Sequence, residues 1–211
     1  MEPIYWNNAI NKLSQIDPIL KKIINGNQNN ILKSKGDAFS TLVKSIIGQQ
    51  ISVKAAESIH KRLLDQIDYT LTPDSILLAN PVHLKATGLS RQKVEYLRNI
   101  ASYFINNPSA TSNKFLTTAT IEEITNNLIK IKGIGMWTIE MFLIFYAMKP
   151  DIFPIKDIGL LNAMKKSYNI ADIKSDNGIE KIIKISNKWK PYRTVATWYL
   201  WLYIDNKVIE Y

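Results

Sequence analysis

The chain of 211 residues contains no cysteine. Disulfide bridges, thiolate zinc sites and a cysteine-held iron–sulfur cluster are therefore excluded. Histidine is scarce as well. His60 and His83 have no ligand-type partners at a metal-binding spacing, so we expect surface or interface residues rather than metal ligands.

Long apolar runs are also missing. The longest, Met141 to Met148, is too short to cross a bilayer and predicts a buried helix. Residues 1–13 lack an apolar stretch behind basic residues, so no secretory signal is evident. We therefore expect a soluble intracellular protein without a membrane partner, in the cytoplasm or nucleoid, or in the nucleus if the source is eukaryotic.

No convincing strand of five or more alternating apolar and polar residues is evident either. Apolar residues instead recur at helical spacing along most of the chain, as at Phe39, Leu42, Val43, Ile46 and Ile47. The sequence predicts an all-α fold of roughly ten helices. Two helical lobes with a groove between them are expected, a central one at about 37–148 and a second from 1–36 and 149–211.

Helix start signals support this assignment. Ser52 and Ser90 stand at N-cap positions, and Thr72 precedes a proline that suits the first helical turn. Thr120 and Glu123 have the spacing of a capping box. The helix that begins there is expected to run to about residue 131.

Positive charge is in excess, with 27 Lys and Arg against 18 Asp and Glu, a net charge of +9 and a pI near 9.5. Such an excess favours a polyanionic partner, either nucleic acid or an acidic membrane surface.

The turn Lys132-Gly133-Ile134-Gly135 separates two predicted helices. Glycines allow tight turns and close backbone approach, and the N-terminus of the second helix presents N–H groups and a positive dipole end. These features are typical of a phosphate site. An ordinary helix–helix connection would also explain the two glycines.

Asp157 follows Gly135 by 22 residues, after the turn marked by Pro154. A carboxylate in the first turn of a helix is favoured by the helix dipole, so an ordinary structural role is one explanation. A phosphate site and a single carboxylate also suit chemistry on a nucleic acid.

Two further segments allow both a structural and a functional interpretation. The segment from Trp189 to Trp201 is rich in aromatic residues, with Lys190 and Arg193 among them, a pattern suited to core packing or to stacking on bases. Pro191 is expected in the first turn of a helix there. Gln49 and Gln50 join two predicted helices, either as a simple turn or as side chains that enter a duplex beside a displaced base.

Together, four segments resemble the helix–hairpin–helix DNA glycosylases, in particular the 3-methyladenine DNA glycosylase II (AlkA-type) branch. They are residues 42–56, 131–145, 153–159 and 189–201, within a similarity that covers about residues 37–203. The resemblance implies that residues 1–211 form one glycosylase unit with an active-site groove between its lobes. It implies a monomeric enzyme of base excision repair that acts on damaged double-stranded DNA.

The resemblance also implies roles for individual residues. Asp157 would be the catalytic carboxylate, which stabilises the sugar cation and orients water. The hairpin would grip a DNA phosphate, and Gln50, with Gln49 beside it, would be the wedge. The flipped base would meet four residues: Trp137, Trp201, Met141 and Tyr192.

No cofactor is required on this resemblance, although family hairpins often bind Na⁺ or K⁺ through backbone carbonyls, here near Ile129, Ile131 and Ile134. Relatives that also cleave the DNA backbone carry a Schiff-base lysine where this chain has Trp137. Lys132 and Lys156 do not occupy that position. We therefore expect a monofunctional glycosylase for alkylated purines of the 3-methyladenine type.

This chain departs from the family pattern at Ile139, where alanine is frequent, and at Lys156, where an acid is common. It also lacks a strand pattern before residue 37, so the β-rich domain of longer relatives is not expected. Two alternatives stay open. One is a non-catalytic DNA-binding module that senses distorted duplex, and the other is a bifunctional glycosylase and lyase for oxidised bases.

Overall fold

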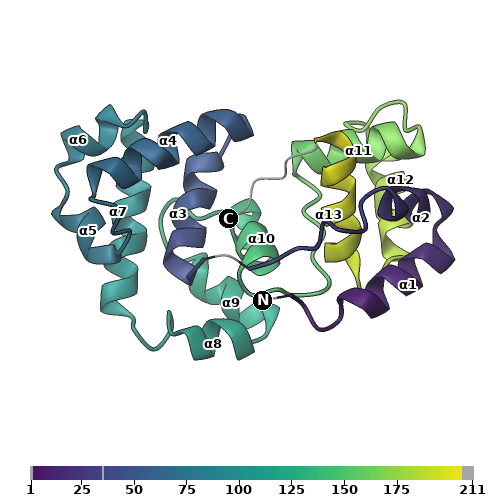
Figure 1. Cartoon of the computed structure of the whole chain (residues 1–211), viewed down its shortest axis with the longest axis horizontal. Coiled ribbons are helices and arrows are strands. Elements are labelled where there is room, and N and C mark those ends of the chain that lie inside the picture. The colour runs from purple at the N-terminus through teal and green to yellow at the C-terminus, as the bar shows by residue number, and fades with distance from the viewer. Residues whose placement is uncertain (1, 35, 206–211) are drawn as a thin grey trace. The chain divides into compact units, whose positions relative to one another are not determined.

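The structure is a computed structural model that describes residues 2–34 and 36–205. Every regular element in these residues is an α-helix, which confirms the all-α prediction (Figure 1). Thirteen helices are found there instead of about ten. Three of them have only six residues, too short to show a periodic pattern: α5 (Pro73–Leu78), α6 (Pro81–Ala86) and α8 (Asn113–Thr118). None of the described helices is long and apolar enough to span a membrane.

The chain forms two compact units, which we describe separately. The central unit comprises residues 36–147, and the terminal unit comprises the described residues 2–34 and 148–205. The terminal unit therefore joins the first and last helices of the chain.

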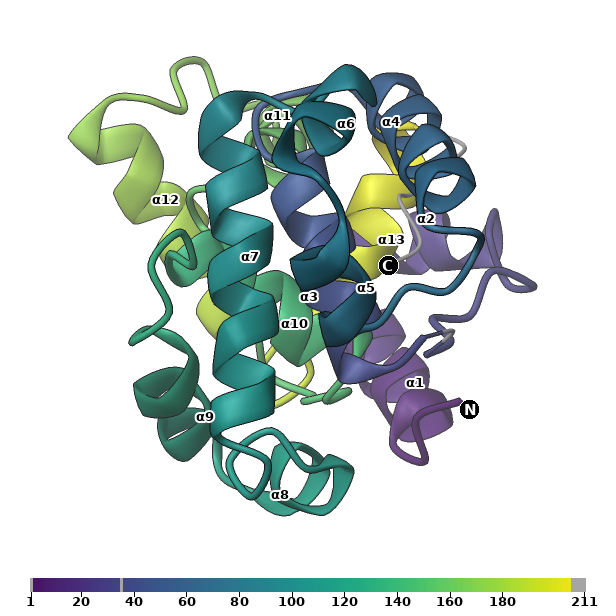
Figure 2. The same cartoon turned by 90° about the vertical axis from the view of Figure 1, so that its left-hand side faces the viewer.

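The central unit is built around two buried helices, α3 and α10. The face of α3 predicted from helical spacing is fully buried, and α10 is buried almost all round because its sequence is nearly all apolar. Helix α3 packs on both α7 and α10, and the three are neighbours in Figure 2. The longer helices of this unit are α3 (Ala38–Gly48), α4 (Val53–Gln66), α7 (Arg91–Asn106), α9 (Ile121–Leu128) and α10 (Met136–Phe145).

The predicted helix starts in this unit are confirmed. Ser52 and Ser90 accept hydrogen bonds from backbone N–H groups of α4 and α7. Thr72 and Thr120 each form a complete capping box, the first with Ser75 and the second with Glu123.

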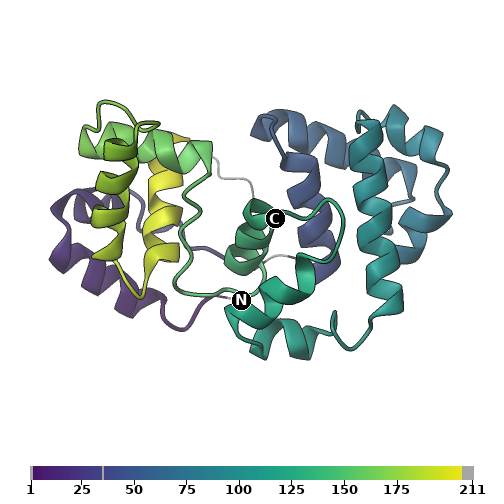
Figure 3. The same cartoon turned by 180° about the vertical axis from the view of Figure 1, so that it is seen from behind.

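The terminal unit is organised around α13, which packs on α11, α2 and α1. Figure 3 shows this unit from behind, with yellow α13 next to green α11. Most of α13 is buried, including Trp198 and Tyr199, as core packing predicts. Its helices are α1 (Trp6–Ile16), α2 (Pro18–Asn25), α11 (Ile158–Tyr168), α12 (Asp176–Asn187) and α13 (Arg193–Ile204).

Two predicted helix boundaries are wrong, the end of the helix from Thr120 and the helical position of Pro191. The helix expected to run from Thr120 to about residue 131 ends at Leu128, because the turn to the glycines begins at once. Asp157 is the N-cap of α11 and lies directly before the first turn of that helix. Pro191 lies before the N-cap Tyr192 and so outside the first turn of α13.

A buried carboxylate, Asp17, connects the parts of the terminal unit. Its Oδ1 accepts the N–H groups of Ile19 and Leu20 at 3.0 Å each, which caps α2. Its Oδ2 accepts the Tyr168 hydroxyl at 2.8 Å and the Trp189 indole N–H at 2.9 Å. Four hydrogen-bond donors therefore depend on this one carboxylate, and one of them, the Trp189 indole, belongs to a fully buried side chain.

Asp17→Asn is expected to lower the free energy of unfolding by about 2–3 kcal/mol, because an amide leaves a buried donor without an acceptor. Urea unfolding followed by tryptophan fluorescence and circular dichroism measures the loss. Asp37→Asn is the matched control, since Asp37 is an exposed N-cap and asparagine caps about as well. Equal stability of the two variants would contradict the role assigned to Asp17.

Candidate functional site

The hairpin between α9 and α10 is a tight backbone turn. The Ile131 N–H donates to the Leu128 carbonyl, and the Ile134 N–H donates to the Ile131 carbonyl, both at 3.0 Å. Gly133 has φ +104°, in the region that favours glycine. Gly135 is the N-cap of α10 and no side chain caps this helix. The turn therefore ends on a helix N-terminus of the kind that binds phosphate.

Helix α7 packs directly against the hairpin. A Cβ on Gly133 would lie 2.2 Å from Cγ of Tyr96, so only glycine fits against that ring. The Asn99 side chain donates to the Lys132 carbonyl at 3.2 Å. The glycine is therefore required by the packing of the turn on α7 as well as by its φ angle.

Lys132, a predicted phosphate contact, is exposed and forms an ion pair with Glu95 at 2.6 Å. The pair raises the pKa of Lys132 and lowers the pKa of Glu95. A DNA phosphate at this position would compete with Glu95 for the ammonium group.

The two glutamines between α3 and α4 differ in their surroundings. Gln50 is exposed and has φ +58°, a left-handed conformation that is uncommon for residues with a side chain. Gln49 is half-buried, and its amide donates to Thr138 Oγ1 at 2.9 Å and weakly to the Gly133 carbonyl at 3.5 Å. Gln49 thus contacts the hairpin and α10, whereas Gln50 is available to a ligand.

Two predicted base contacts lie on α10 in the central unit. Trp137 is half-buried at the first turn, so part of its ring is accessible. Met141 is only 2% exposed and belongs to the core. Of the two, Trp137 is the side chain that a base can contact directly. Ile139, where the family often has alanine, is fully buried in the same helix.

Asp157 and Trp201, which are 44 positions apart, are brought together in the terminal unit. Asp157 Oδ1 accepts the Leu160 N–H at 2.7 Å and the Trp201 indole N–H at 2.9 Å. Asp157 is half-buried. A Cβ on Gly159 would lie 3.2 Å from Asp157 Oδ1 and 3.5 Å from the Trp201 ring, so glycine here leaves room for both. Both donors hold the carboxylate in one orientation.

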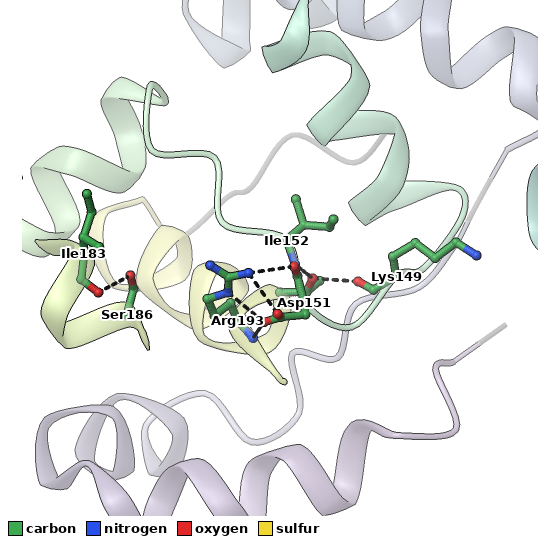
Figure 4. Close-up of polar contacts among 7 residues, drawn as sticks. Lys149, Asp151, Ile152, Ile183, Ser186 and Arg193 are labelled. Atoms are coloured by element: carbon green, nitrogen blue, oxygen red, sulfur yellow. Dashed lines mark hydrogen bonds and ion pairs between the residues drawn. The ribbon is translucent and has the colours of Figure 1, made fainter. Parts of the chain in front are cut away.

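The segment that leads to Asp157 is fixed to the start of α13 (Figure 4). Arg193 donates to both carboxylate oxygens of Asp151, at 2.7 and 2.9 Å, in a two-point contact. Thr194 donates to the Lys149 carbonyl at 2.6 Å and accepts the Ile152 N–H at 2.9 Å. Since α13 also carries Trp201, this one helix fixes residues 149–152 at its start and Asp157 further along.

Tyr192, the fourth predicted base contact, packs on α1 and on Tyr5, the N-cap of α1. Its ring stacks on Tyr5 with centroids 6.4 Å apart, and Lys12 Nζ lies 5.7 Å from its centroid. The Tyr5 hydroxyl donates to the Met148 carbonyl, and burial raises the pKa of Tyr5. Tyr192 is half-buried by these contacts.

The two histidines differ in their surroundings. Burial and the nearby Lys44 lower the pKa of His60 to about 4, and His83 is exposed. Residues 2–34 and 36–205 contain no cluster of three or more metal-ligating side chains.

The family model for HhH-GPD superfamily base excision DNA repair proteins matches residues 43–189, more than half of the chain. The chain belongs to this superfamily. The matched residues contain the hairpin and the helix-capping Asp157 described above.

The chain is similar to two named proteins of one organism over most of their length. The chain is 29% identical to DNA-3-methyladenine glycosylase 1 of Schizosaccharomyces pombe, over 86% of this chain and 79% of that protein. It is 31% identical to the alkylbase DNA glycosidase-like protein mag2 of the same organism, over 77% and 76%. The solved S. pombe 3-methyladenine DNA glycosylase in complex with abasic DNA superposes with a TM-score of 0.84 at 27% identity, covering 97% and 98% of the two chains.

Sequence reasoning did not identify several residues that support the site. Tyr96, Glu95 and Asn99 contact the hairpin, and Asp151 pairs with Arg193. These contacts join residues at least 33 positions apart, so no local spacing indicates them. The glycines at 133 and 159 are local signals, because each leaves room for a side chain that packs against it.

Gly133→Ala is expected to destabilise the protein by roughly 2–4 kcal/mol, because it adds backbone strain and a clash with Tyr96. Affinity for a duplex with an abasic-site analogue should fall by about tenfold, equivalent to roughly 1.4 kcal/mol of lost phosphate contact. Thermal unfolding and fluorescence anisotropy measure the two effects.

Gly135→Ala is the matched control for stability. A Cβ there meets nothing within 4 Å, so the free energy of unfolding should change by no more than about 1 kcal/mol, the cost of a poorer N-cap. Similar losses of stability in both variants would contradict the packing described for Gly133.

Proposed function

We propose that the protein is a monofunctional DNA glycosylase that hydrolyses the N-glycosidic bond of alkylated purines in base excision repair. The observation that carries the proposal is the Asp157 carboxylate, oriented by the Leu160 N–H and the Trp201 indole. Membership of the HhH-GPD superfamily supports it, as do relatives named DNA-3-methyladenine glycosylase.

In the proposed reaction, Asp157 stabilises the positive charge that develops on the sugar as the base departs. The same carboxylate orients the water that attacks the anomeric carbon. An alkylated purine is already cationic, so it leaves with little help from a general acid. This agrees with a site built around one carboxylate.

The proposed base contacts are aromatic, which suits a cationic purine through stacking and cation–π attraction. Trp201, Tyr192 and Trp137 are the proposed contacts of this kind. Met141 lies in the core of the central unit and would act by shaping the environment of Trp137.

For DNA binding, we propose that the hairpin from Lys132 to Gly135 holds a phosphate while Gln50 fills the space of the displaced base. The net charge of +9 favours the duplex as partner. The uncapped N-terminus of α10 and the exposed Lys132 supply donors and charge at the hairpin. We expect a monomer that acts where the genomic DNA lies, in a nucleoid or a nucleus.

A monovalent cation, Na⁺ or K⁺, is a further part of this proposal. Backbone carbonyl oxygens are suitable ligands for such ions. Ile129, Ile131 and Ile134 belong to one tight turn, which brings their main-chain groups close together. They would hold the ion, which would stiffen the hairpin next to the phosphate; no catalytic cofactor is required.

Asp157→Asn is expected to slow release of free base by about 100-fold or more, because the neutral amide stabilises no sugar cation. Single-turnover excision from duplexes with defined alkylated purines, with released bases identified by mass, measures the rate. Affinity for an abasic-site duplex should be retained. Unchanged base release in this variant would refute the assignment.

Asp37→Asn is again the control, because it makes the same change at the N-cap of another helix. Binding without base release from any lesion, even by the unaltered protein, would favour a damage-sensing module instead.

Trp137 occupies the position of the lyase nucleophile, so borohydride is expected to trap no covalent adduct between the protein and lesion-containing DNA. After base release, the abasic strand should stay intact until hot alkali cleaves it, as seen on a denaturing gel. A trapped adduct would favour the bifunctional glycosylase for oxidised bases.

A further inference from the structure

The exposed Gln50 is held in an unfavourable conformation. Its φ of +58° is one that a residue with a side chain adopts when its surroundings impose it, and such positions cluster at functional sites. The preceding residue, Gln49, is held by two contacts.

The first of these contacts is Lys93 on α7. Its ammonium group donates to the Ile47 carbonyl at 2.8 Å and to the Gln49 carbonyl at 2.9 Å, at the C-terminal end of α3. Lys93 is half-buried, and burial lowers its pKa. A cation at a helix C-terminus is favoured by the helix dipole. This lysine is therefore used inside the protein and not as a phosphate contact.

The second contact is the Gln49 side chain itself. Its amide donates to Thr138 Oγ1 on α10, one turn into the helix that follows the hairpin. Thr138 is only 1% exposed, so this hydrogen bond is protected from solvent. Gln49 is thus bonded to α10 through its side chain and to α7 through its main-chain carbonyl.

We propose that Lys93 is a positioning residue for base displacement, because it holds the loop that carries Gln50. Gln49 is a second attachment of this loop and not part of the wedge. The inference rests on the proposed function. Lys93 and Tyr96 are one turn apart on α7, so one helix supports both the loop and the hairpin. Once the hairpin binds a phosphate, Gln50 is held in a fixed place along the duplex, and binding energy is used to displace the base.

The chain offers a matched control on the same helix. Arg98 donates to the carbonyls of Ile76, Leu77 and Ala79 at the end of α5, which carries no part of the site. Lys93→Met and Arg98→Met each remove one half-buried cation that caps a helix. They therefore match in charge and in the kind of structural loss, but only Lys93 contacts the loop.

The test compares both variants with the unaltered protein on duplexes that carry a lesion beside 2-aminopurine, whose fluorescence rises on unstacking. Lys93→Met should reduce the fluorescence rise and slow single-turnover base release by about tenfold, short of the roughly 100-fold that ångström-scale misplacement can cost. Affinity for an abasic-site duplex, where no base has to be displaced, should match that of Arg98→Met.

A second substrate separates positioning from general damage to the enzyme. When the lesion lies opposite an abasic site, displacement is easier, so the defect of Lys93→Met should shrink to less than about threefold. A defect of equal size on both substrates, or equal defects in Lys93→Met and Arg98→Met, would overturn the inference. Absence of base release by the unaltered protein would instead refute the proposed function.

Gln49→Leu provides an independent route if Lys93→Met does not fold. It removes the hydrogen bond to Thr138 and leaves every lysine in place. It should show the same loss of 2-aminopurine fluorescence and the same rescue by an opposing abasic site. Unchanged base displacement in Gln49→Leu would contradict the role of Gln49 as an anchor.

Discussion

The central unit depends on one close contact, the backbone of Gly133 against the ring of Tyr96. A positive φ turns the chain there, and the missing side chain lets the hairpin lie directly on α7. Once this contact is made, α10 must begin at Met136, and its Thr138 is placed to receive Gln49. The turn is thus a structural junction as well as the proposed phosphate site. Its two roles are compatible because the packing uses the side of the turn that faces α7.

The terminal unit applies the same principle to a carboxylate. Asp157 caps α11 and accepts the Trp201 indole, while the preceding segment is fixed to the first turn of α13 by Arg193 and Thr194. A helix N-cap is a favourable place for an ionised carboxylate, because N–H groups and the dipole stabilise the negative charge. The structural role of Asp157 as a helix cap and its proposed chemical role are therefore compatible. The ordinary interpretation of this residue as a helix cap is correct and does not exclude catalysis.

Much of the fold follows from local patterns. Helical spacing and the caps Ser52, Ser90 and Thr120 are set within a few residues, so they were predictable and are confirmed. The end of α9 and the position of Pro191 were predicted wrongly, because tertiary contacts decide where a helix starts and stops. For the candidate site, the sequence could indicate the hairpin, Asp157 and the Trp189–Trp201 segment, whereas the roles of the individual residues stay predictions.

The sequence by itself determined the class of the protein. The absence of cysteine, the glycine turn and the spacing to Asp157 are all properties of neighbouring or regularly spaced residues. Only the tertiary structure decided that Gln49 contacts Thr138, that Lys93 holds the loop and that Trp201 donates to Asp157. These pairs are separated by 44 to 89 positions, and side-chain direction across such distances depends on how the helices pack. Residue types and their spacing were therefore enough to predict the class of reaction, but the side-chain contacts that support the site were not predictable from them.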